Sequence, residues 1–357
     1  MEDALARWQQ GWTGTRQVAL ASLRPVIWSE TQGVLGDGGV EILPVSLRDG
    51  DGQVSAEAAA AEVMISGGLP LDEQVFAGLR RARFVLRPYV GYDDIDVEAA
   101  TRHGILVANV PDTFVEEVAN HAMALILAAN RRLARMDRFV RDGRWQAGED
   151  PWVAARPVAR LSVQTLGLVG FGTIGRMVAE RARAFGFRLL AADPYVAPEA
   201  GKAYGVELVT LEALLRQSDV VSVHVLLTQE TRGLLDATRL GWMRPGAILV
   251  NTSRGPVVDE VALVEALRAR RLAGAALDVF QSEPLDPRHP LTELDDVLLA
   301  PHLASYSVEG VAVHRARVGQ LALQAARGGL PERKVILNKN LYDRVAALPG
   351  CAGLTRH

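Results

Sequence analysis

Residues 165–175 read TLGLVGFGTIG, and this stretch decides the fold class. The mostly apolar run 165–169 is typical of a buried strand, and a GxGxxG triplet follows it and opens a helical pattern that continues to Arg183. Here Gly170 permits the tight turn, Gly172 lets a pyrophosphate approach the backbone, and Gly175 lets helix and strand pack closely. The helix N-terminus then offers N–H groups to the phosphates. The alternative is a glycine turn that binds nothing.

Further apolar runs, separated mostly by helical patterns, follow this loop. They are residues 188–192, 219–225, 247–251, 274–279 and 296–300. Runs that are apolar on both faces are typical of a buried parallel sheet. Together with 165–169 they predict an α/β domain with six strands in a doubly wound parallel sheet of the Rossmann type.

The chain before the glycine loop predicts a smaller α/β domain. Short strands are expected at 84–86 and 105–110, and a short helix at 55–61 begins after a serine cap. A long helix is expected over 114–140, and the glycines and prolines of 142–164 indicate a connection between domains.

A last helix, 308–326, follows the sixth strand of the larger domain. We therefore expect a discontinuous substrate domain, 1–115 with 308–357, into which a nucleotide domain, 116–307, is inserted.

Composition narrows the class of protein. The 357 residues suggest two domains, and 39 Lys and Arg against 42 Asp and Glu leave a net charge of −3, which argues against nucleic-acid binding. The single cysteine, Cys351, can form neither an internal disulfide nor a zinc–cysteine cluster, so no metal site is expected. The acidic N-terminus lacks a signal-peptide pattern, and the apolar stretch 118–129 is too short to span a bilayer. We expect a cytoplasmic protein without membrane contact.

Asp193 ends the second strand of the nucleotide domain, eighteen residues after Gly175. An acid at this position accepts hydrogen bonds from the adenosine ribose hydroxyls and repels a 2′-phosphate. No arginine stands beside it, since Pro194 and Tyr195 follow. The pattern favours NAD over NADP.

A cation, a carboxylate and an imidazole follow three later strands of the same sheet. Arg254, Glu283 and His302 should meet at one edge, because ligands bind outside the carboxyl ends of parallel strands. Arg254 can bind a carboxylate and polarise a carbonyl, and His302 can exchange the carbonyl proton. Glu283 would orient the imidazole, and Asp278 would hold a nicotinamide amide. Taken singly, these residues are as well explained as a surface arginine, turn acids and a core histidine.

Ordered motifs across residues 84–338 resemble the D-isomer-specific 2-hydroxyacid dehydrogenase family, which includes phosphoglycerate and glycerate dehydrogenases. They are VGYDDID at 90–96, NVP at 109–111, the glycine loop with Asp193, HVLLT at 224–228, and the Arg254, Glu283 and His302 motifs.

The resemblance implies hydride transfer between NAD and a 2-oxo or D-2-hydroxy acid, a flavodoxin-like substrate domain, and a homodimer through the nucleotide domain. The implied catalytic residues are Arg254, Glu283 and His302. The implied cofactor contacts are Gly170, Gly172, Thr173, Ile174, Gly175, Asp193, His224, Thr228, Thr252 and Asp278. The implied substrate contacts are Tyr89, Val90, Gly91 and Arg254, with backbone N–H groups holding the carboxylate.

Some positions depart from the family pattern. Leu226 stands where a proline is common, and Tyr89 and Tyr306 are bulky residues next to the expected substrate site. We expect side chains around 66–69, Tyr89 and Tyr306 to set the substrate, which the sequence does not identify.

Two alternatives remain at this level. An NAD(H)-sensing regulator similar to the corepressor branch of this family would bind NADH with little or no turnover, and residues 109–132 resemble that branch. The second alternative is a relative of this family that oxidises formate or phosphite. The formate type resembles this chain but carries glutamine where Glu283 stands.

Overall fold

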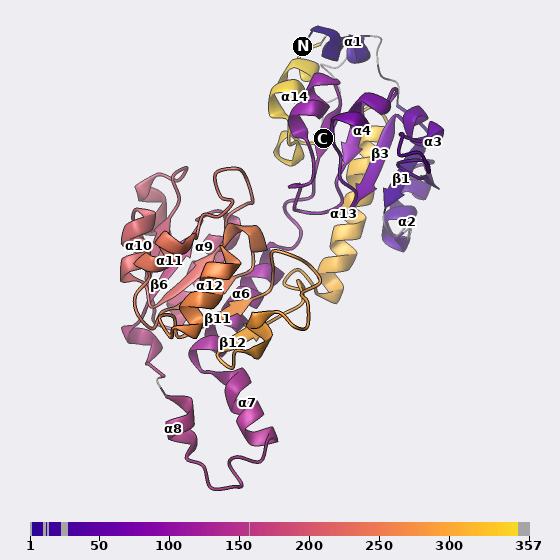
Figure 1. Cartoon of the computed structure of the whole chain (residues 1–357). Helices are drawn as coiled ribbons and strands as arrows, with labels where there is room; N and C mark the ends of the chain where they lie inside the picture. Colours follow the sequence, from indigo (N-terminus) through magenta and orange to yellow (C-terminus); the bar gives the residue numbers. More distant parts are fainter. Residues whose placement is uncertain (1, 10–11, 13, 23–27, 157, 349–357) are drawn as a thin grey trace. The chain divides into compact units, whose positions relative to one another are not determined.

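The computed structural model describes residues 2–9, 12, 14–22, 28–156 and 158–348. Contacts divide the chain into two compact units, one comprising Met1–Thr113 with Ser307–His357 and the other Phe114–Tyr306 (Figure 1). The domain boundaries predicted from the sequence, at 115/116 and 307/308, remain predictions. Cys351 lies outside the described residues. None of the helices in the described ranges is long and apolar enough to cross a membrane.

The second unit is built on a seven-stranded sheet with the order β12-β11-β10-β9-β6-β7-β8. Its strands are β6 (Thr165–Val169), β7 (Arg188–Ala192), β8 (Val206–Leu208), β9 (Val220–Val223), β10 (Ile248–Asn251), β11 (Gly274–Leu277) and β12 (Val297–Leu299). All neighbouring strands are parallel. The order reverses between β6 and β9, which is the switch point of a doubly wound sheet.

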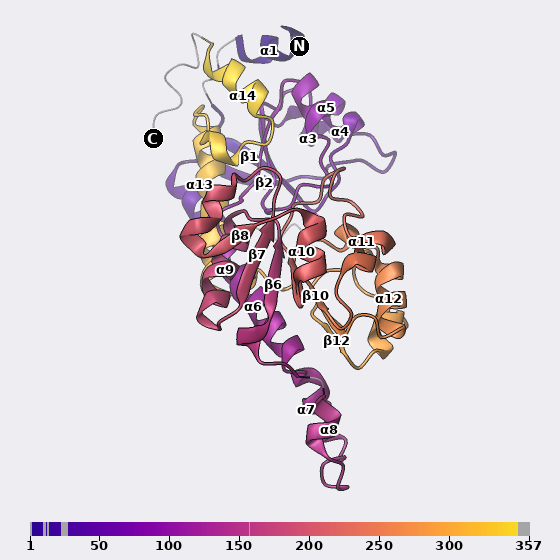
Figure 2. The same cartoon turned by 90° about the vertical axis from the view of Figure 1, so that its left-hand side faces the viewer.

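Helices cover both faces of this sheet (Figure 2). One face packs on α6 (Val115–Asn130) and α9 (Thr173–Ala184). The other packs on α10 (Leu211–Gln217), α11 (Ala237–Trp242) and α12 (Glu260–Arg268). Because each strand buries side chains on both faces, the apolar runs of the sequence are continuous rather than alternating.

The first unit contains a five-stranded parallel sheet with the order β2-β1-β3-β4-β5, the flavodoxin-like order. Its strands are β1 (Gln17–Ser22), β2 (Glu41–Pro44), β3 (Val63–Gly67), β4 (Phe84–Leu86) and β5 (Leu106–Ala108). One face packs on α1 (Glu2–Gln9), α2 (Ser29–Asp37), α13 (Val308–Ala326) and α14 (Lys339–Ala346). The other packs on α3 (Ala56–Ala60), α4 (Glu73–Gly78) and α5 (Val97–Arg102). The predicted fold class, a Rossmann domain inserted into a flavodoxin-like domain, is confirmed.

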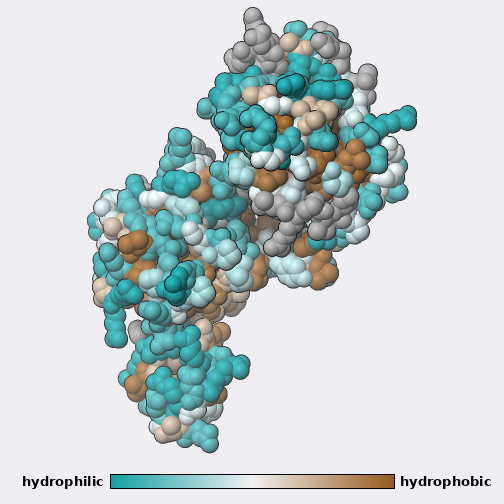
Figure 3. Space-filling view, turned by 45° about the vertical axis from the view of Figure 1, so that its right-hand side comes forward, coloured by the Kyte–Doolittle hydropathy of each residue, from teal (hydrophilic) through white to brown (hydrophobic). Residues whose placement is uncertain are grey.

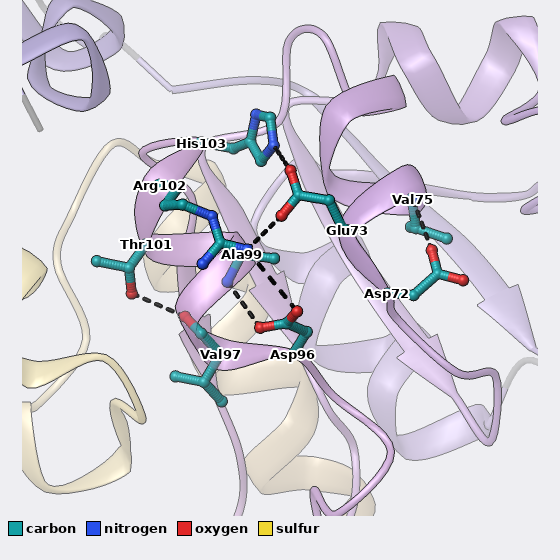
Figure 4. A network of polar contacts seen from close by, with 9 residues as sticks. All are labelled: Asp72, Glu73, Val75, Asp96, Val97, Ala99, Thr101, Arg102 and His103. Atoms are coloured by element: carbon teal, nitrogen blue, oxygen red, sulfur yellow. Dashed lines mark hydrogen bonds and ion pairs between the residues drawn. The ribbon is translucent and has the colours of Figure 1, made fainter.

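A polar network joins α4 to α5 (Figure 4). Glu73 binds Arg102 and lies 2.7 Å from His103 Nε2, and the hydrogen bonds from these two groups lower the pKa of the Glu73 carboxyl. Asp96 caps α5 by accepting the Ala99 N–H at 2.8 Å. The network fixes the end of the VGYDDID segment, which runs directly into α5.

The predicted helix over 114–140 is wrong as one continuous element. The chain leaves α6 at Asn130, Arg132 takes a left-handed conformation with φ of +53°, and α7 (Leu133–Arg141) starts again. The Arg132 guanidinium binds the Asp296 carboxylate, far along the chain, so a tertiary contact stabilises the break. No glycine marks the turn, so the sequence shows no break in the helical pattern.

Residues 142–164, expected to connect the domains, lie instead within the second unit. They hold α8 (Pro151–Ala155) and the 3₁₀ turn η1 (Leu161–Val163), and with α7 they form an arm that reaches beyond the sheet (Figure 1). The other 3₁₀ turns are η2 (Pro198–Tyr204), η3 (Gly255–Val257), η4 (Pro290–Glu293) and η5 (Arg333–Val335). The face of the molecule in Figure 3 is largely hydrophilic, with separate hydrophobic patches.

The sequence prediction also missed four strands. Strands β1, β2 and β3 lie in the N-terminal region, and β8 is a three-residue edge strand with one exposed acid. Strands β4, β6 and β7 have the predicted bounds, as does α13.

Candidate active site

The glycine loop after β6 has the geometry that its three glycines predict. Gly170 has φ of +95°, and a Cβ atom there would lie 2.6 Å from the His224 carbonyl oxygen. A Cβ on Gly175 would lie 2.4 Å from the Gly170 carbonyl oxygen, so the first turn of α9 packs directly on the loop. A Cβ on Gly172 would meet nothing within 4 Å. This open backbone stands at the N-terminus of α9, ahead of Thr173 and Ile174, where a phosphate can approach.

Asp193 follows β7 and faces the glycine loop. Its carboxylate accepts the Phe171 N–H at 2.9 Å and the Tyr195 N–H at 3.0 Å. These bonds fix the side chain and leave further lone pairs of its oxygens for a ligand. The Tyr195 hydroxyl donates to Glu230 at 2.5 Å, which places a second carboxylate on this side of the sheet.

Two predicted cofactor residues carry buried polar atoms without a protein partner. His224 Nε2 lies 2.9 Å from Ser222 Oγ, whereas its Nδ1 atom is buried and, among the described residues, unpartnered. Thr252 Oγ1, directly after β10, is in the same state. Burial lowers the pKa of His224 to about 4, so its ring is neutral at pH 7. Buried polar atoms are normally satisfied, so these two fit a site that a ligand completes.

Thr228 is placed differently from the other predicted cofactor residues. It is exposed, and its hydroxyl lies 3.2 Å from Thr231 Oγ1 in a turn that the Thr231 side chain closes. Among the described residues, it forms no hydrogen bond with the other predicted cofactor residues.

Arg254, Glu283 and His302 follow β10, β11 and β12, three strands that lie next to one another in the sheet. His302 Nδ1 lies 2.6 Å from Glu283 Oε2. Glu283 Oε1 accepts the Phe280 N–H at 3.0 Å, so the carboxylate is held from its own loop as well. The structure therefore brings the acid and the imidazole into direct contact.

The charge balance favours an ionised Glu283. Partial burial raises the pKa of its carboxyl, but the hydrogen bonds from His302 and Phe280, with the charges of His302 and Arg254, outweigh burial and lower that pKa. Arg254 is close enough to contribute because its turn packs on the Glu283 loop. A Cβ on Gly255 would lie 1.9 Å from the Phe280 carbonyl carbon.

The turn that carries Arg254 depends on Asn251, a residue that sequence reasoning did not single out. Its side chain accepts the Ser253 N–H at 3.0 Å and donates to the Arg254 carbonyl oxygen at 3.0 Å. Asparagine is a typical sequence signal for such a turn, because its side chain can bind the backbone N–H two residues further on.

Asp278 shapes the turn that carries His302. Its fully buried carboxylate accepts the Leu303 and Ala304 N–H groups at 2.9 Å each. His121 Nε2, from α6, lies 3.5 Å from Asp278 Oδ1. The sequence analysis assigned no role to His121. A polar residue on a helix face that packs on the sheet was the available signal.

The predicted substrate contacts Tyr89, Val90 and Gly91 lie in residues 88–91, called the substrate segment below, in the first unit after β4. Val110 N–H donates to the Tyr89 carbonyl oxygen at 3.2 Å, and Asn109 Nδ2 donates to the Val90 carbonyl oxygen at 2.7 Å. Among the described residues, neither the Val90 N–H nor the Gly91 N–H donates a hydrogen bond. These two donors are therefore available to a carboxylate.

Arg87, which immediately precedes this segment, is buried. It binds the Leu69 carbonyl oxygen and the Asp94 carboxylate at 2.9 Å each. No group of three or more His, Cys, Asp or Glu side chains in the described ranges is arranged to hold a metal ion.

A nucleotide-binding sheet with these residues at its carboxyl edge defines an NAD(P)-dependent oxidoreductase. Residues 123–304 match the family model described as D-isomer specific 2-hydroxyacid dehydrogenase, NAD binding domain. The chain belongs to this family, and it is an NAD(P)-dependent 2-hydroxyacid dehydrogenase acting on a CH–OH group.

Individual relatives agree. The glyoxylate reductase of Korarchaeum cryptofilum is 44% identical over 270 residues, covering 74% of this chain and 80% of the relative. A D-lactate dehydrogenase from Aquifex aeolicus, solved with NAD and lactic acid, has a TM-score of 0.76 and 30% identity, with 87% of this chain and 96% of that chain covered. An NADPH-dependent glyoxylate/hydroxypyruvate reductase from Sinorhizobium meliloti, solved with NADP and malonate, has a TM-score of 0.73 and 31% identity, with 87% and 92% covered.

Proposed function

We propose that this chain reduces a small 2-oxo acid to its D-2-hydroxy acid with NADH, and that Arg254, Glu283 and His302 form its catalytic group. The observation that carries the proposal is the 2.6 Å contact between His302 Nδ1 and Glu283 Oε2 at the carboxyl edge of the nucleotide-binding sheet. NADH supplies the hydride that is added to C2 of the substrate.

The protein groups supply the proton and the charge. Because Nδ1 of His302 is engaged by Glu283, Nε2 is the atom that gives its proton to the carbonyl oxygen during reduction and takes it back during oxidation. The ionised Glu283 stabilises the imidazolium and orients the ring. Arg254 binds the substrate carboxylate and polarises the carbonyl by charge-assisted hydrogen bonds. The N–H groups of Val90 and Gly91, which donate no hydrogen bond within the described residues, are further donors that we propose for a substrate carboxylate.

NAD is the cofactor that the side chains support. The Asp193 carboxylate, fixed by Phe171 and Tyr195, accepts the ribose hydroxyls, and with Glu230 nearby it disfavours the 2′-phosphate of NADP. Gly172, His224 and Thr252 provide the open backbone and the unpartnered polar atoms that a dinucleotide would meet, and Asp278 would face the nicotinamide amide.

The substrate class follows from the relatives and from the charges near the segment. The two reductases named above point to glyoxylate and hydroxypyruvate. Arg48, a cation that follows β2 in the first unit, is paired with the Asp72 carboxylate at 2.8 Å, which leaves it poorly suited to a phosphate group.

The test is NADH oxidation with glyoxylate, hydroxypyruvate, pyruvate, larger 2-oxo acids and phosphorylated analogues. Turnover with the small acids supports the proposal. Tight NADH binding without turnover on any acid would contradict it and favour the NAD(H)-sensing alternative.

We also propose a homodimer through the second unit, in the cytoplasm. The arm exposes large apolar side chains, including Trp145 (62% exposed) and Trp152 (80% exposed), which a partner would cover. Sedimentation of the purified protein, beside a variant with both tryptophans changed to serine, tests this. A monomeric wild-type protein would contradict it.

The single thiol in the sequence agrees with a reducing compartment, and cell fractionation tests the proposed location in the cytoplasm.

A further inference from the structure

Three consecutive carbonyl oxygens of the substrate segment each accept a hydrogen bond from elsewhere in the first unit. The Pro88 oxygen is 2.9 Å from His314 Nε2, the Tyr89 oxygen accepts the Val110 N–H, and the Val90 oxygen accepts the Asn109 amide. Val110 and Asn109 are close in sequence, directly after β5. His314 is the exception, because it comes from α13, 226 residues further along the chain.

The His314 ring is in a defined protonation state. His314 is 4% exposed, and this burial is the main reason why the pKa of its ring is lowered. The ring is therefore neutral at pH 7. A carbonyl oxygen can only accept, so the ring hydrogen is on Nε2, which donates to Pro88. Nδ1 is then the acceptor, and the Thr113 hydroxyl, 2.7 Å away, is the donor.

The position of this contact in the chain is informative. Thr113 is the last residue of the first unit before the chain enters the second, and Ser307 is the first residue after the chain returns. His314 lies in the second turn of the helix that begins directly after Ser307. The His314 ring therefore joins Pro88, at the start of the substrate segment, to Thr113, where the chain leaves the first unit. His314 itself lies shortly after the point where the chain returns to that unit.

We infer that His314, with Thr113, is a positioning residue for substrate binding: it holds the Pro88 carbonyl so that the N–H groups of Val90 and Gly91 keep the geometry that a carboxylate requires. This inference rests on the proposed function, because it takes a 2-oxo acid as the ligand of the segment. His314 contacts neither cofactor nor reacting atoms in this scheme, and it acts through the backbone.

The experiment uses a graded set of variants in the full-length protein. His314→Leu removes both hydrogen bonds, whereas His314→Gln keeps a donor for Pro88. Thr113→Val removes the hydroxyl, and Thr113→Ser is its matched control. We expect His314→Leu to raise the KM for the 2-oxo acid about tenfold or more, which corresponds to the loss of one or two hydrogen bonds. Thr113→Val and His314→Gln should raise it less, and Thr113→Ser should be close to wild type. The Kd for NADH and the kcat should change little.

A second measurement reads the segment without turnover. Hydrogen–deuterium exchange over residues 87–97 should be faster in His314→Leu than in wild type, and close to wild type in Thr113→Ser. An unchanged KM and unchanged exchange in His314→Leu would overturn the inference. Equal losses of NADH and 2-oxo acid affinity would do so too, since they indicate general destabilisation. If the wild-type protein turns over no 2-oxo acid, the proposed function fails, and the exchange comparison alone decides whether His314 holds the segment.

Discussion

The backbone N–H of His302 donates to the carbonyl oxygen of Asp278 at 2.8 Å, and the carboxylate of the same aspartate accepts the next two N–H groups, of Leu303 and Ala304. His302 has φ of +52°, a left-handed conformation that costs a non-glycine residue about 1 kcal/mol. The three hydrogen bonds hold it there. Asp278 thus sets the direction in which the imidazole leaves the backbone, in addition to any contact with a cofactor.

Replacing Asp278 with asparagine should loosen this turn. One carboxylate oxygen becomes an NH₂ group that faces a backbone N–H, and a buried donor is left without an acceptor. We expect the free energy of unfolding to fall by about 1–3 kcal/mol and kcat to fall at least about tenfold as His302 loses its orientation. Asp259→Asn, which keeps a side-chain cap for α12, is the matched control and should retain both. Equal kcat in Asp278→Asn and wild type would contradict the role of this turn.

Replacing His302 with alanine should affect chemistry rather than cofactor binding. Loss of a general acid–base group lowers turnover by roughly 10²–10⁴-fold, while the Kd for NADH, measured by fluorescence titration, should stay near the wild-type value. Glu283→Gln keeps a hydrogen-bond acceptor for Nδ1 but removes the charge that stabilises the imidazolium, so its loss should be smaller. Full turnover in His302→Ala would remove this histidine from the mechanism.

Two glycine-to-alanine changes separate folding from cofactor binding. At Gly255 the new methyl group would lie 1.9 Å from the Phe280 carbonyl carbon, so the backbones after β10 and β11 must move apart. We expect a clear loss of thermal stability together with activity. At Gly172 nothing lies within 4 Å, so alanine should leave the Tm nearly unchanged and weaken NADH binding through contact with the pyrophosphate. Unweakened NADH binding in Gly172→Ala would place the phosphates elsewhere.

Asp193→Ala should relax the preference for NAD. Without the carboxylate the ribose loses its acceptor and the 2′-phosphate loses a repelling charge, so the ratio of kcat/KM for NADH over NADPH should fall at least about tenfold. Steady-state kinetics with both cofactors measure this ratio. An unchanged ratio would show that another group selects the cofactor. Since Phe171 and Tyr195 also lose a partner, the Tm should be recorded in parallel.

His224 should make the cofactor-free protein sensitive to mild acid. Its folded-state pKa of about 4 lies below the value of about 6.5 expected when unfolded, so the unfolded chain binds the extra proton between these pH values. Stability should therefore fall as the pH is lowered from about 6.5 to about 4, by at most about 3 kcal/mol from this residue. Urea unfolding at several pH values should show a weaker pH dependence in His224→Gln. The same dependence in both proteins would rule out this origin.

Much of the nucleotide-binding unit could be predicted because its signals are local. The run 165–169, the glycine triplet and Asp193 stand within one strand–helix–strand segment. To predict that Arg254, Glu283 and His302 lie together, one further argument was needed: the carboxyl ends of parallel strands share an edge of the sheet. The contact between Glu283 and His302 agrees with that reasoning. Strands β1 to β3 escaped prediction because the N-terminal region offered no comparable motif.

By itself, then, the sequence determined the doubly wound sheet, the inserted arrangement and the three residues at one sheet edge, since each depends on local periodicity or on spacing within a strand–loop unit. Only the tertiary structure decided the break at Arg132, the Asp278 clamp on the His302 turn, the approach of His121 and the bond from His314 to Pro88. These contacts join residues between 24 and more than 200 positions apart. No local pattern encodes them, because each exists only after separate elements have packed together and buried their polar groups.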